Sequence, residues 1–323
     1  MPDNTRVPGD RMRKEIQYHP EARLRRDGIE LVYDAFGSPA DSPLLLIAGL
    51  GNQLISWRED FCRQLAASGL FVIRFDNRDA GLSTRLDESP SPGLFAIASA
   101  YLWGTPLHAP YTLHDMAEDA LHILNHLGID QAHVLGGSLG GMIAQTIALQ
   151  QPQRLLSLTL MLTTRSGSLW PLPKPRSLIL FRRPAVGREA LVERYLLIAA
   201  ALKGPRFPLN PTALHQHAEQ LYQRSPEAPG TLRQMAAIAA SRIPPQSLSE
   251  IRVPTLVVHG KADPLIPAAH GRRLARLIPG ARLLLVEGLG HELPPGAWPL
   301  VIEALLEFMA YMPQEMGSSS QDT

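Results

Sequence analysis

The sequence predicts an α/β protein built on a mostly parallel sheet that is flanked by helices. Two observations lead to this fold class. Short apolar runs alternate with segments of helical period along most of the 323 residues, which favours parallel strands joined by right-handed helical crossovers. One block, residues 165–245, breaks the alternation because it carries only helical patterns. With 45% hydrophobic residues, the chain can bury the core that such a sheet requires.

The region before this block is expected to contain six strands and three helices. Residues 24–37 have the pattern of a two-stranded hairpin that turns at Asp27-Gly28. Continuous apolar runs, typical of strands covered on both faces, lie at residues 43–49, 70–76, 131–137 and 155–163. Helical periods lie at residues 55–68, 112–128 and 138–152. The helix at 112–128 begins with a Thr112 cap and stops at Gly128.

The helical block is expected to lie as an insertion over one edge of the sheet. Its helical patterns fall near residues 187–203, 211–224 and 229–242. Alternation then resumes, with strands at 254–260 and 281–288 and helices near 267–278 and 297–312. We therefore expect an eight-stranded sheet whose core is formed by residues 1–164 and 246–312, with a helical cap at 165–245. Residues 1–20 are expected to be flexible, and the tail 313–323 to be disordered.

The composition argues against several classes of protein. The net charge of +1 gives no overall attraction for nucleic acid. No apolar run approaches the roughly 18 residues of a membrane span, and the first residues lack the apolar segment of a secretory signal. The single cysteine, Cys62, cannot form an internal disulfide and fits a reducing compartment. We therefore expect a cytoplasmic protein that acts on a small molecule.

Positive charge is concentrated in the predicted cap. Residues 165–245 contain twelve Lys and Arg against four Glu and no Asp, a net charge of +8, whereas the rest of the chain carries −7. One interpretation places these charges on the solvated outer faces of helices. The other is a weak attraction for an anionic substrate, a carrier or a lipid surface, with the LILFRR segment at 178–183 as the interfacial patch.

A strand, a glycine turn and a helix follow one another at residues 44–57, LLLIAGLGNQLISW. Such a turn can hold the pyrophosphate of a dinucleotide, or it can present a backbone N–H to an oxyanion. Asp76 ends the next strand, where a ribose-binding acid would lie, but Leu54 replaces the third glycine of the dinucleotide fingerprint. The turn alone leaves both interpretations open.

Residues 133–145, HVLGGSLGGMIAQ, contain a G-x-S-x-G pattern centred on Ser138. The pattern follows a predicted strand and opens a predicted helix, which is the context of a nucleophilic serine. The chain must reverse there in strained backbone geometry, so the residues two positions before and after the serine, Gly136 and Gly140, must be small. The alternative is a glycine-rich turn with an incidental serine.

A serine nucleophile needs a base, and candidates for the base and the acid follow Ser138 in chain order. Asp263 lies just beyond the strand at 254–260, and His291 lies just beyond the strand at 281–288. The carboxyl ends of parallel strands lie at one edge of a sheet, so we expect these three side chains to meet.

The other histidines that we weighed have ordinary explanations. His122 and His126 stand one helical turn apart but lack the H-E-x-x-H pattern of a zinc site, so a solvated helix face explains them. His259 ends a predicted strand and is interpreted as structural, and His215 and His217 belong to the predicted cap. We therefore predict no metal site.

These motifs resemble those of the α/β-hydrolase superfamily along residues 24–312. The match includes GGSLGG around Ser138, HGKADPLIP around Asp263 and GLGHELP around His291. The segment RFDNRDAGLST is similar to the family loop D-x-R-G-x-G-x-S, with Asp79 in place of the first glycine. Three segments, LIAGLGNQLISW, FVIRFDNRDAGLST and GGSLGGMIAQ, more narrowly resemble bacterial carboxylesterases and the anthracycline-type polyketide methyl esterases.

The resemblance implies an oxyanion hole formed by the backbone N–H groups of Leu50 and Leu139. Ala48 departs from the family pattern, because many members carry a supporting histidine at that position. This departure affects the expected geometry of the loop that carries Leu50, but not the expected reaction at Ser138. Asn52 and Gln53 are expected to add polar contacts to a substrate.

The expected activity is ester hydrolysis through an acyl-enzyme, without a cofactor or a metal ion. Trp170 and Phe181 of the predicted cap are expected to line an apolar pocket for the acyl or alcohol part of the substrate. A lactonase, a thioesterase, a C–C bond hydrolase or a cofactor-free haloperoxidase or perhydrolase would use the same three residues. Two alternatives belong to other classes, namely a small-molecule receptor that retains the fold and a dinucleotide-dependent enzyme.

Overall fold

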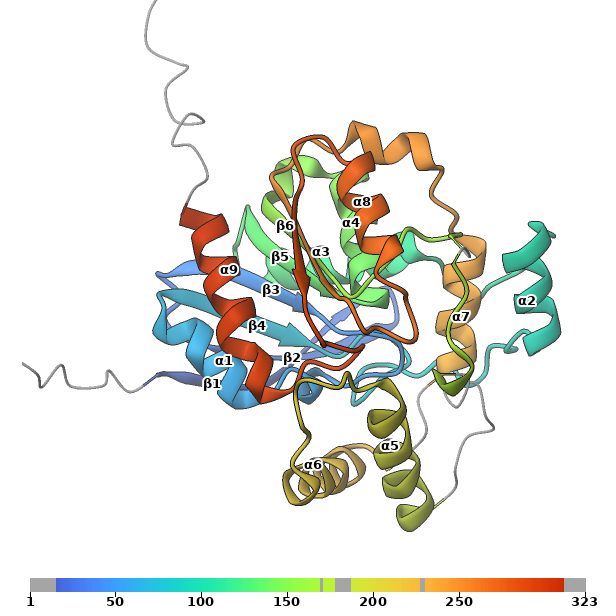
Figure 1. Cartoon of the computed structure of the whole chain (residues 1–323), viewed down its shortest axis with the longest axis horizontal. Coiled ribbons are helices and arrows are strands. Elements are labelled where there is room, and N and C mark those ends of the chain that lie inside the picture. The colour runs from blue at the N-terminus through green and yellow to red at the C-terminus, as the bar shows by residue number, and fades with distance from the viewer. Residues whose placement is uncertain (1–15, 169–170, 178–186, 227–229, 311–323) are drawn as a thin grey trace, which may run out of the picture.

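A computed structural model describes residues 16–168, 171–177, 187–226 and 230–310, which form one twisted sheet with helices on both faces (Figure 1). The strands run in the order β1-β2-β4-β3-β5-β6-β7-β8, and only the pairs made by β2 are antiparallel. Their bounds are β1 (Tyr18–Arg26), β2 (Ile29–Phe36), β3 (Ser42–Ile47), β4 (Leu70–Phe75), β5 (Ala132–Gly137), β6 (Leu155–Met161), β7 (Thr255–Gly260) and β8 (Arg282–Val286). This sheet confirms the predicted fold class.

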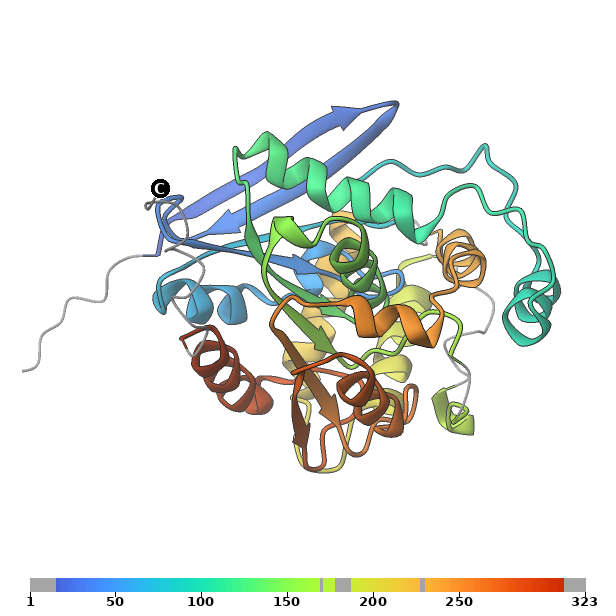
Figure 2. The ribbon, with the colours of Figure 1, turned by 90° about the horizontal axis from the view of Figure 1, so that it is seen from above.

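Helices cover both faces of the sheet (Figure 2). On one face lie α1 (Glu59–Ala67) and α9 (Trp298–Ala310), which share a hydrophobic core with β3, β4 and β7. On the other face lie α3 (Leu113–His126), α4 (Leu139–Gln150) and α8 (Ala269–Leu277). Because both faces are covered, β4, β5 and β7 are buried along their whole length, as continuous apolar runs require.

The N-terminal hairpin begins earlier than the sequence predicts. β1 starts at Tyr18, so the expectation of a flexible segment up to residue 20 is wrong for its last residues. Tyr18 Oη donates to Asp34 Oδ2 at 3.2 Å, and His19 Nε2 lies 2.9 Å from the carbonyl oxygen of Gly37. β1 is an edge strand with most of its side chains exposed, so it lacks the apolar run that marks a covered strand.

One helix is absent from the sequence-based expectations. α2 (Leu94–Trp103) has the sequence LFAIASAYLW, in which nearly every residue is apolar or small. No polar face alternates with an apolar one, so the helical period is invisible. α2 lies at the edge of the molecule beside α7 (Thr231–Ala240), away from the sheet (Figure 1).

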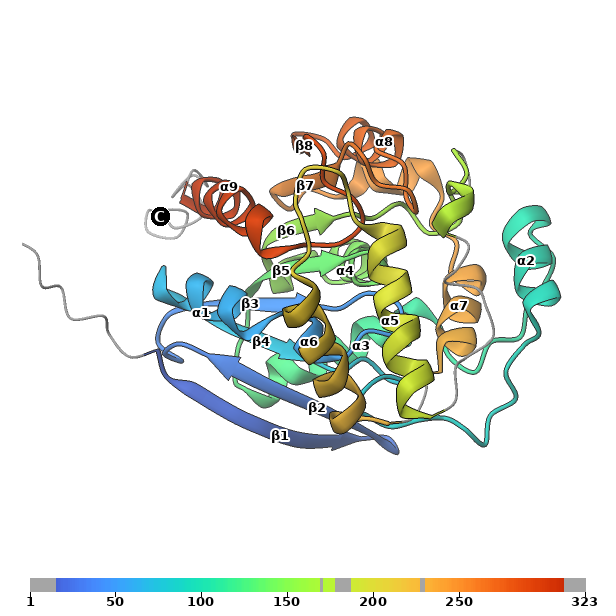
Figure 3. The ribbon, with the colours of Figure 1, turned by 60° about the horizontal axis from the view of Figure 1, so that its bottom comes forward.

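The remaining helices lie close to the positions predicted for the insertion. α5 (Arg188–Leu202) and α6 (Pro211–Arg224) lie side by side (Figure 3), and Arg188 Nε donates to Glu219 Oε2 across them at 2.9 Å. The C-terminal end of α5 reaches the loop after β8, because the N–H of His291 donates to the carbonyl oxygen of Leu202 at 2.8 Å. The C-terminal end of α6 reaches the loop after β3, where Gln53 Nε2 donates to the carbonyl oxygen of Leu221 at 2.8 Å.

Candidate active site

Ser138 stands on a strained turn between β5 and α4. Its backbone has φ +53° and ψ −115°, in the left-handed half of conformational space that a non-glycine residue rarely enters. A Cβ added to Gly136 would overlap the carbonyl oxygen of Gly140, and a Cβ added to Gly140 would overlap the carbonyl oxygen of Ile47. Both clashes are with backbone, so both positions require glycine, as the pattern predicted.

The turn is tied to the next strand of the sheet. The N–H of Ser138 donates to the carbonyl oxygen of Met161 at 2.9 Å, and Thr163 Oγ1 donates to the carbonyl oxygen of Ser138 at 2.6 Å. Thr163 is fully buried. The serine backbone is therefore fixed from both sides before any substrate arrives.

Ser138, His291 and Asp263 form a continuous hydrogen-bonded line. Ser138 Oγ lies 3.1 Å from His291 Nε2, and His291 Nδ1 lies 2.7 Å from Asp263 Oδ2. An ionised carboxylate only accepts hydrogen bonds, so Nδ1 carries the proton and Nε2 presents its lone pair to the serine hydroxyl. The three residues that the sequence singled out are thus brought together from the ends of three different strands.

Asp263 is held rigidly beneath the imidazole. Its side chain is fully buried, and its second oxygen, Oδ1, accepts from the N–H groups of Leu265 and Ile266 at 2.8 Å each. His259, which we interpreted as structural, packs beside it with Nε2 at 2.8 Å from the carbonyl oxygen of Ile266. These contacts leave Oδ2 aimed at His291.

The electrostatic surroundings favour the protonated form of His291. Burial of the ring opposes protonation, but the charge of Asp263 and its hydrogen bond outweigh burial and raise the pKa of His291 above its usual 6.5. Burial raises the pKa of the neighbouring Glu292 to about 7, against the opposing charges of His291 and Arg58. Sequence reasoning gave Glu292 no role, because a glutamate in a loop carries no pattern of its own.

The loop after β3 lies against the serine turn. A Cβ added to Gly49 would stand 3.3 Å from Ser138 Cβ, which shows how closely the two turns approach. Within the described ranges, no acceptor is found for the backbone N–H of Leu50 or for that of Leu139, the first residue of α4. Two unengaged donors beside a serine hydroxyl are what an oxyanion hole requires, and the helix N-terminus adds positive potential.

Gln234 of α7 holds this loop, and sequence reasoning missed it. Gln234 is fully buried, and its Oε1 accepts from the N–H of Gly51 at 2.8 Å while its Nε2 donates to the carbonyl oxygen of Arg78 at 2.9 Å. Asn77 Nδ2 adds a hydrogen bond to the carbonyl oxygen of Ala48 at 3.1 Å. The loop is thus supported by an amide from a distant helix, although Ala48 replaces the supporting histidine. No local signal in the sequence could pair residue 234 with residue 51.

The two residues expected to contact substrate from this loop differ in their surroundings. Asn52 is exposed, with its amide beside Gly49. Gln53 is buried, and its Oε1 accepts from Arg224 Nη1 at 3.0 Å while its Nε2 bonds α6, so both ends of its amide are occupied. Trp170, Phe181 and the 178–183 segment lie outside the described residues.

Asp76, the candidate for ribose binding, is fully engaged inside the protein. Oδ1 accepts from the N–H of Leu54 at 2.6 Å, and Oδ2 accepts from the N–H of Leu82 and pairs with Arg224 Nη2 at 2.8 Å. Its side chain is fully buried. The carboxylate that would bind the ribose of a dinucleotide instead pairs with an arginine of α6. This contact argues against the interpretation of the glycine turn as a dinucleotide site.

Asp79 ties the same loop to α7. It occupies the left-handed region at φ +66°, the kind of conformation for which the family pattern has glycine. Its carboxylate is fully buried and pairs with both Nε and Nη2 of Arg233 at 2.8 and 2.7 Å, while Tyr111 Oη donates to Oδ2 at 2.7 Å. The departure from the family motif thus forms a buried ion pair between the core and the insertion.

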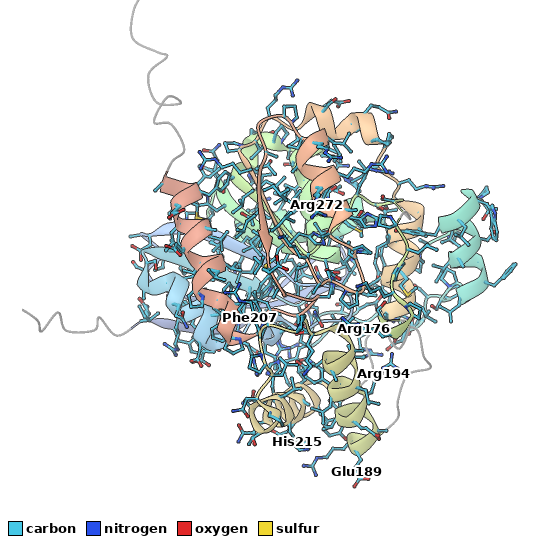
Figure 4. All side chains as sticks on the ribbon, in the orientation of Figure 1. Arg176, Glu189, Arg194, Phe207, His215 and Arg272 are labelled. Atoms are coloured by element: carbon cyan, nitrogen blue, oxygen red, sulfur yellow. The ribbon has the colours of Figure 1, made fainter. Side chains whose placement is uncertain are left out.

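The rival histidines lie elsewhere. The ring of His126 packs edge-on against Tyr33, and His215 lies toward the outer part of α6 (Figure 4), in a groove between α5 and α6. His217 is buried against Tyr195. Within the described ranges, no cluster of three or more His, Cys, Asp or Glu is arranged to hold a metal ion.

Comparisons with known sequences agree with the fold. A family model described as the alpha/beta hydrolase fold matches residues 42–295. Rhodomycin D methylesterase DnrP of Streptomyces peucetius is 35% identical over 302 residues, covering 85% of this chain and 93% of that protein. The putative carbamate hydrolase RutD of Pseudomonas savastanoi pv. phaseolicola is 28% identical over 259 residues, covering 78% of this chain and 88% of that protein.

Solved structures show the same fold. The 2-hydroxy-6-oxo-6-phenylhexa-2,4-dienoate hydrolase of a Rhodococcus strain superposes with a TM-score of 0.70 at 20% identity, covering 91% of this chain and 99% of that one. A hydrolase from Pseudomonas aeruginosa superposes with a TM-score of 0.66 at 24% identity, covering 90% and 98%. At these identities the similarity concerns the fold alone. The family model and the methylesterase relative show that this chain belongs to the α/β-hydrolase family.

Proposed function

We propose that this protein is a serine esterase that cleaves carboxylic esters through an acyl-enzyme. The observation that carries the proposal is the line from Ser138 Oγ to His291 Nε2 at 3.1 Å and from His291 Nδ1 to Asp263 Oδ2 at 2.7 Å. Unengaged N–H groups of Leu50 and Leu139 beside that line support it. No step requires a metal ion or an organic cofactor.

In the acylation step, His291 takes the proton of Ser138 as Oγ attacks the ester carbonyl carbon. Asp263 orients the imidazole and stabilises its charged form. The N–H groups of Leu50 and Leu139 hold the oxyanion, and each such donor typically lowers the barrier by about 3–4 kcal/mol. His291 then passes the proton to the departing alcohol, which leaves the acyl group on Ser138.

In the deacylation step, His291 removes a proton from a water molecule that attacks the acyl carbonyl. The second oxyanion uses the same two N–H groups, and collapse returns the proton from His291 to Ser138 Oγ. The products are a carboxylic acid and an alcohol. Each turnover therefore restores the neutral imidazole with its lone pair toward Ser138.

For the substrate, we propose a methyl ester on a largely apolar molecule. Support comes from the methylesterase relative at 35% identity, which covers most of both chains. We also propose that the insertion, residues 165–245, forms a cap that shapes the pocket for the apolar part, with Asn52 at its entrance as a polar contact. Trp170 and Phe181 stay in the proposal as apolar lining residues.

The direct test is labelling with a fluorophosphonate, read by intact mass and peptide mapping. We expect one adduct on Ser138 of the wild type and none on Ser138→Ala, while Ser68→Ala, which alters an exposed serine after α1, labels like the wild type. A panel of methyl, ethyl and thio esters with lactones would then rank the substrate classes. A wild type that takes up no label would contradict the proposed nucleophile and favour a receptor that retains the fold.

A further inference from the structure

The outward face of α2 is a large apolar surface without a partner in the described residues. Its four large exposed side chains are Leu94, Phe95, Leu102 and Trp103, with exposed fractions of 46%, 83%, 47% and 71%. The opposite side of the helix, with Ile97 and Ala100, packs on Ala236 and Ala239 of α7. Single exposed apolar residues are ordinary, but four on one helix, two of them nearly bare aromatics, call for an explanation. We call these four residues the α2 face.

The chain around this helix carries no formal charge. Between Glu88 and Asp115 there is no Asp, Glu, Lys or Arg. A segment without formal charge can enter an apolar medium without the cost of desolvating an ion. It is suited to contact with an apolar medium, in which Trp and Phe side chains insert from the side.

A line of three arginines, Arg242, Arg165 and Arg273, begins at the C-terminal end of the same helix. Arg242 Nη2 lies 3.5 Å from the carbonyl oxygen of Tyr101, and Arg165 and Arg273 are close enough to each other that their charges interact unfavourably. Burial, followed by the charges of Arg273 and Arg242, lowers the pKa of Arg165. Across residues 16–168, 171–177, 187–226 and 230–310, no carboxylate pairs with any of the three.

We propose that the α2 face and the arginine cluster dock this protein on an anionic lipid surface. The α2 face would lie among the acyl chains near the headgroups, and the arginine cluster, Arg165, Arg242 and Arg273, would bind the phosphate groups. Of the helices in the described part of the chain, none has the length and apolarity to cross a bilayer. The contact is therefore with the membrane surface.

Charge decides between a lipid surface and a second copy of this chain. In a two-fold dimer built on the α2 face, the same surface would meet itself, so each arginine cluster would face only residues that this surface itself supplies. The charge-free segment between Glu88 and Asp115 offers no acid to compensate them. An anionic membrane supplies both an apolar layer for the α2 face and negative charge for the arginine cluster. We therefore propose a membrane rather than a second copy as the partner. The surface differs from the 178–183 segment that the sequence suggested.

The test is co-sedimentation of the full chain with phosphatidylcholine vesicles, with and without phosphatidylglycerol. At low salt we expect the wild type to bind the anionic vesicles, and Phe95→Ser/Trp103→Ser to bind about tenfold more weakly or worse. Arg273→Gln, which lies outside the insertion, should weaken the preference for phosphatidylglycerol, and high salt should abolish it. Hydrolysis of a soluble ester without vesicles should be unchanged in all variants, which shows that they are folded.

Matched controls lie on distant surfaces. Leu300→Ser removes an exposed leucine from α9, and Arg25→Gln removes an arginine from β1, where Glu30 keeps Arg23 as a partner. Both should bind like the wild type. Wild-type protein that stays in the supernatant with anionic vesicles at low salt would overturn the proposal, and so would undiminished binding by the double variant. A wild-type dimer that the double variant converts to a monomer, measured by light scattering, would make this face an interface between copies instead.

Discussion

The serine turn and the loop after β3, residues 48–53, lie side by side in the candidate site but are held in different ways. We call this loop the oxyanion loop, after the role proposed for it. Backbone packing inside the core holds the serine turn, where Gly136 and Gly140 leave no room for a Cβ. Side chains of the insertion hold the oxyanion loop, through Gln234 on Gly51 and Arg224 on Gln53. The turn that carries the nucleophile is therefore part of the core, whereas the position of the oxyanion loop depends on how the insertion packs against it. Variants that affect one half and spare the other test this comparison.

The largest effect is expected in the serine turn. Gly140→Ala places a Cβ on the carbonyl oxygen of Ile47, a backbone atom of the central strand β3 that cannot move aside. We expect complete loss of esterase activity and a loss of about 3 kcal/mol in the free energy of unfolding, the upper end of what overpacking typically costs, measured by denaturant titration. Gly93→Ala is the control, because a Cβ there meets nothing within 4 Å. An unchanged unfolding midpoint for Gly140→Ala would contradict the role given to backbone packing.

The second effect concerns the ion pair between the core and α7. Asp79→Gly restores the residue of the family motif and relieves the backbone at φ +66°. It also removes the buried partner of Arg233, which keeps the more exposed carboxylate of Asp87. Breaking a buried pair on one side typically costs about 3–5 kcal/mol, so the variant should be less stable than the wild type. The double variant Asp79→Gly/Arg233→Met should recover most of the loss in thermal unfolding. Equal stability of the single and double variants would show that the pair does not fasten the insertion.

The third effect separates the oxyanion loop from the fold. Gln234→Met keeps the volume of the side chain but leaves the N–H of Gly51 without its acceptor. We expect kcat to fall by about 10- to 100-fold with little change in KM, because the loop is needed most in the transition state. Labelling of Ser138 by a small fluorophosphonate should slow in parallel. Gln131→Met, which removes a comparable hydrogen bond to the carbonyl oxygen of Gln153 on the surface, should leave kcat unchanged.

The smallest effect is a shift in pH dependence. His291 must be neutral to act as a base, so kcat/KM should be retained above its raised pKa and lost as the pH falls through it. The Glu292 carboxylate, whose own pKa is raised to about 7, helps to raise the pKa of His291. Glu292→Gln should therefore move the acid limb of the kcat/KM profile to lower pH. A limb that moves to higher pH would contradict this assignment.

Most of the core could be predicted because its signals are local. The covered strands are continuous apolar runs, and the cap of α3 is formed by Thr112 and Asp115, three residues apart. α2 escaped prediction because its sequence has no polar face, and the start of β1 escaped because an exposed edge strand has no apolar run. Asp119 shows the same limit. It lies within α3 and pairs with Arg78 from a loop 41 residues away, which no local pattern indicates.

What the sequence determined by itself is the fold class and the three residues of the hydrogen-bonded line. The glycine spacing around Ser138 and the strand ends before Asp263 and His291 depend on steric and topological rules that act over a few residues. Only the tertiary structure decided how the oxyanion loop is held, because Gly51 and Gln234 are 183 residues apart and a single amide leaves no periodic signal. It also decided that Gln53 faces α6, since the direction of a side chain in a loop is set by whatever packs against it.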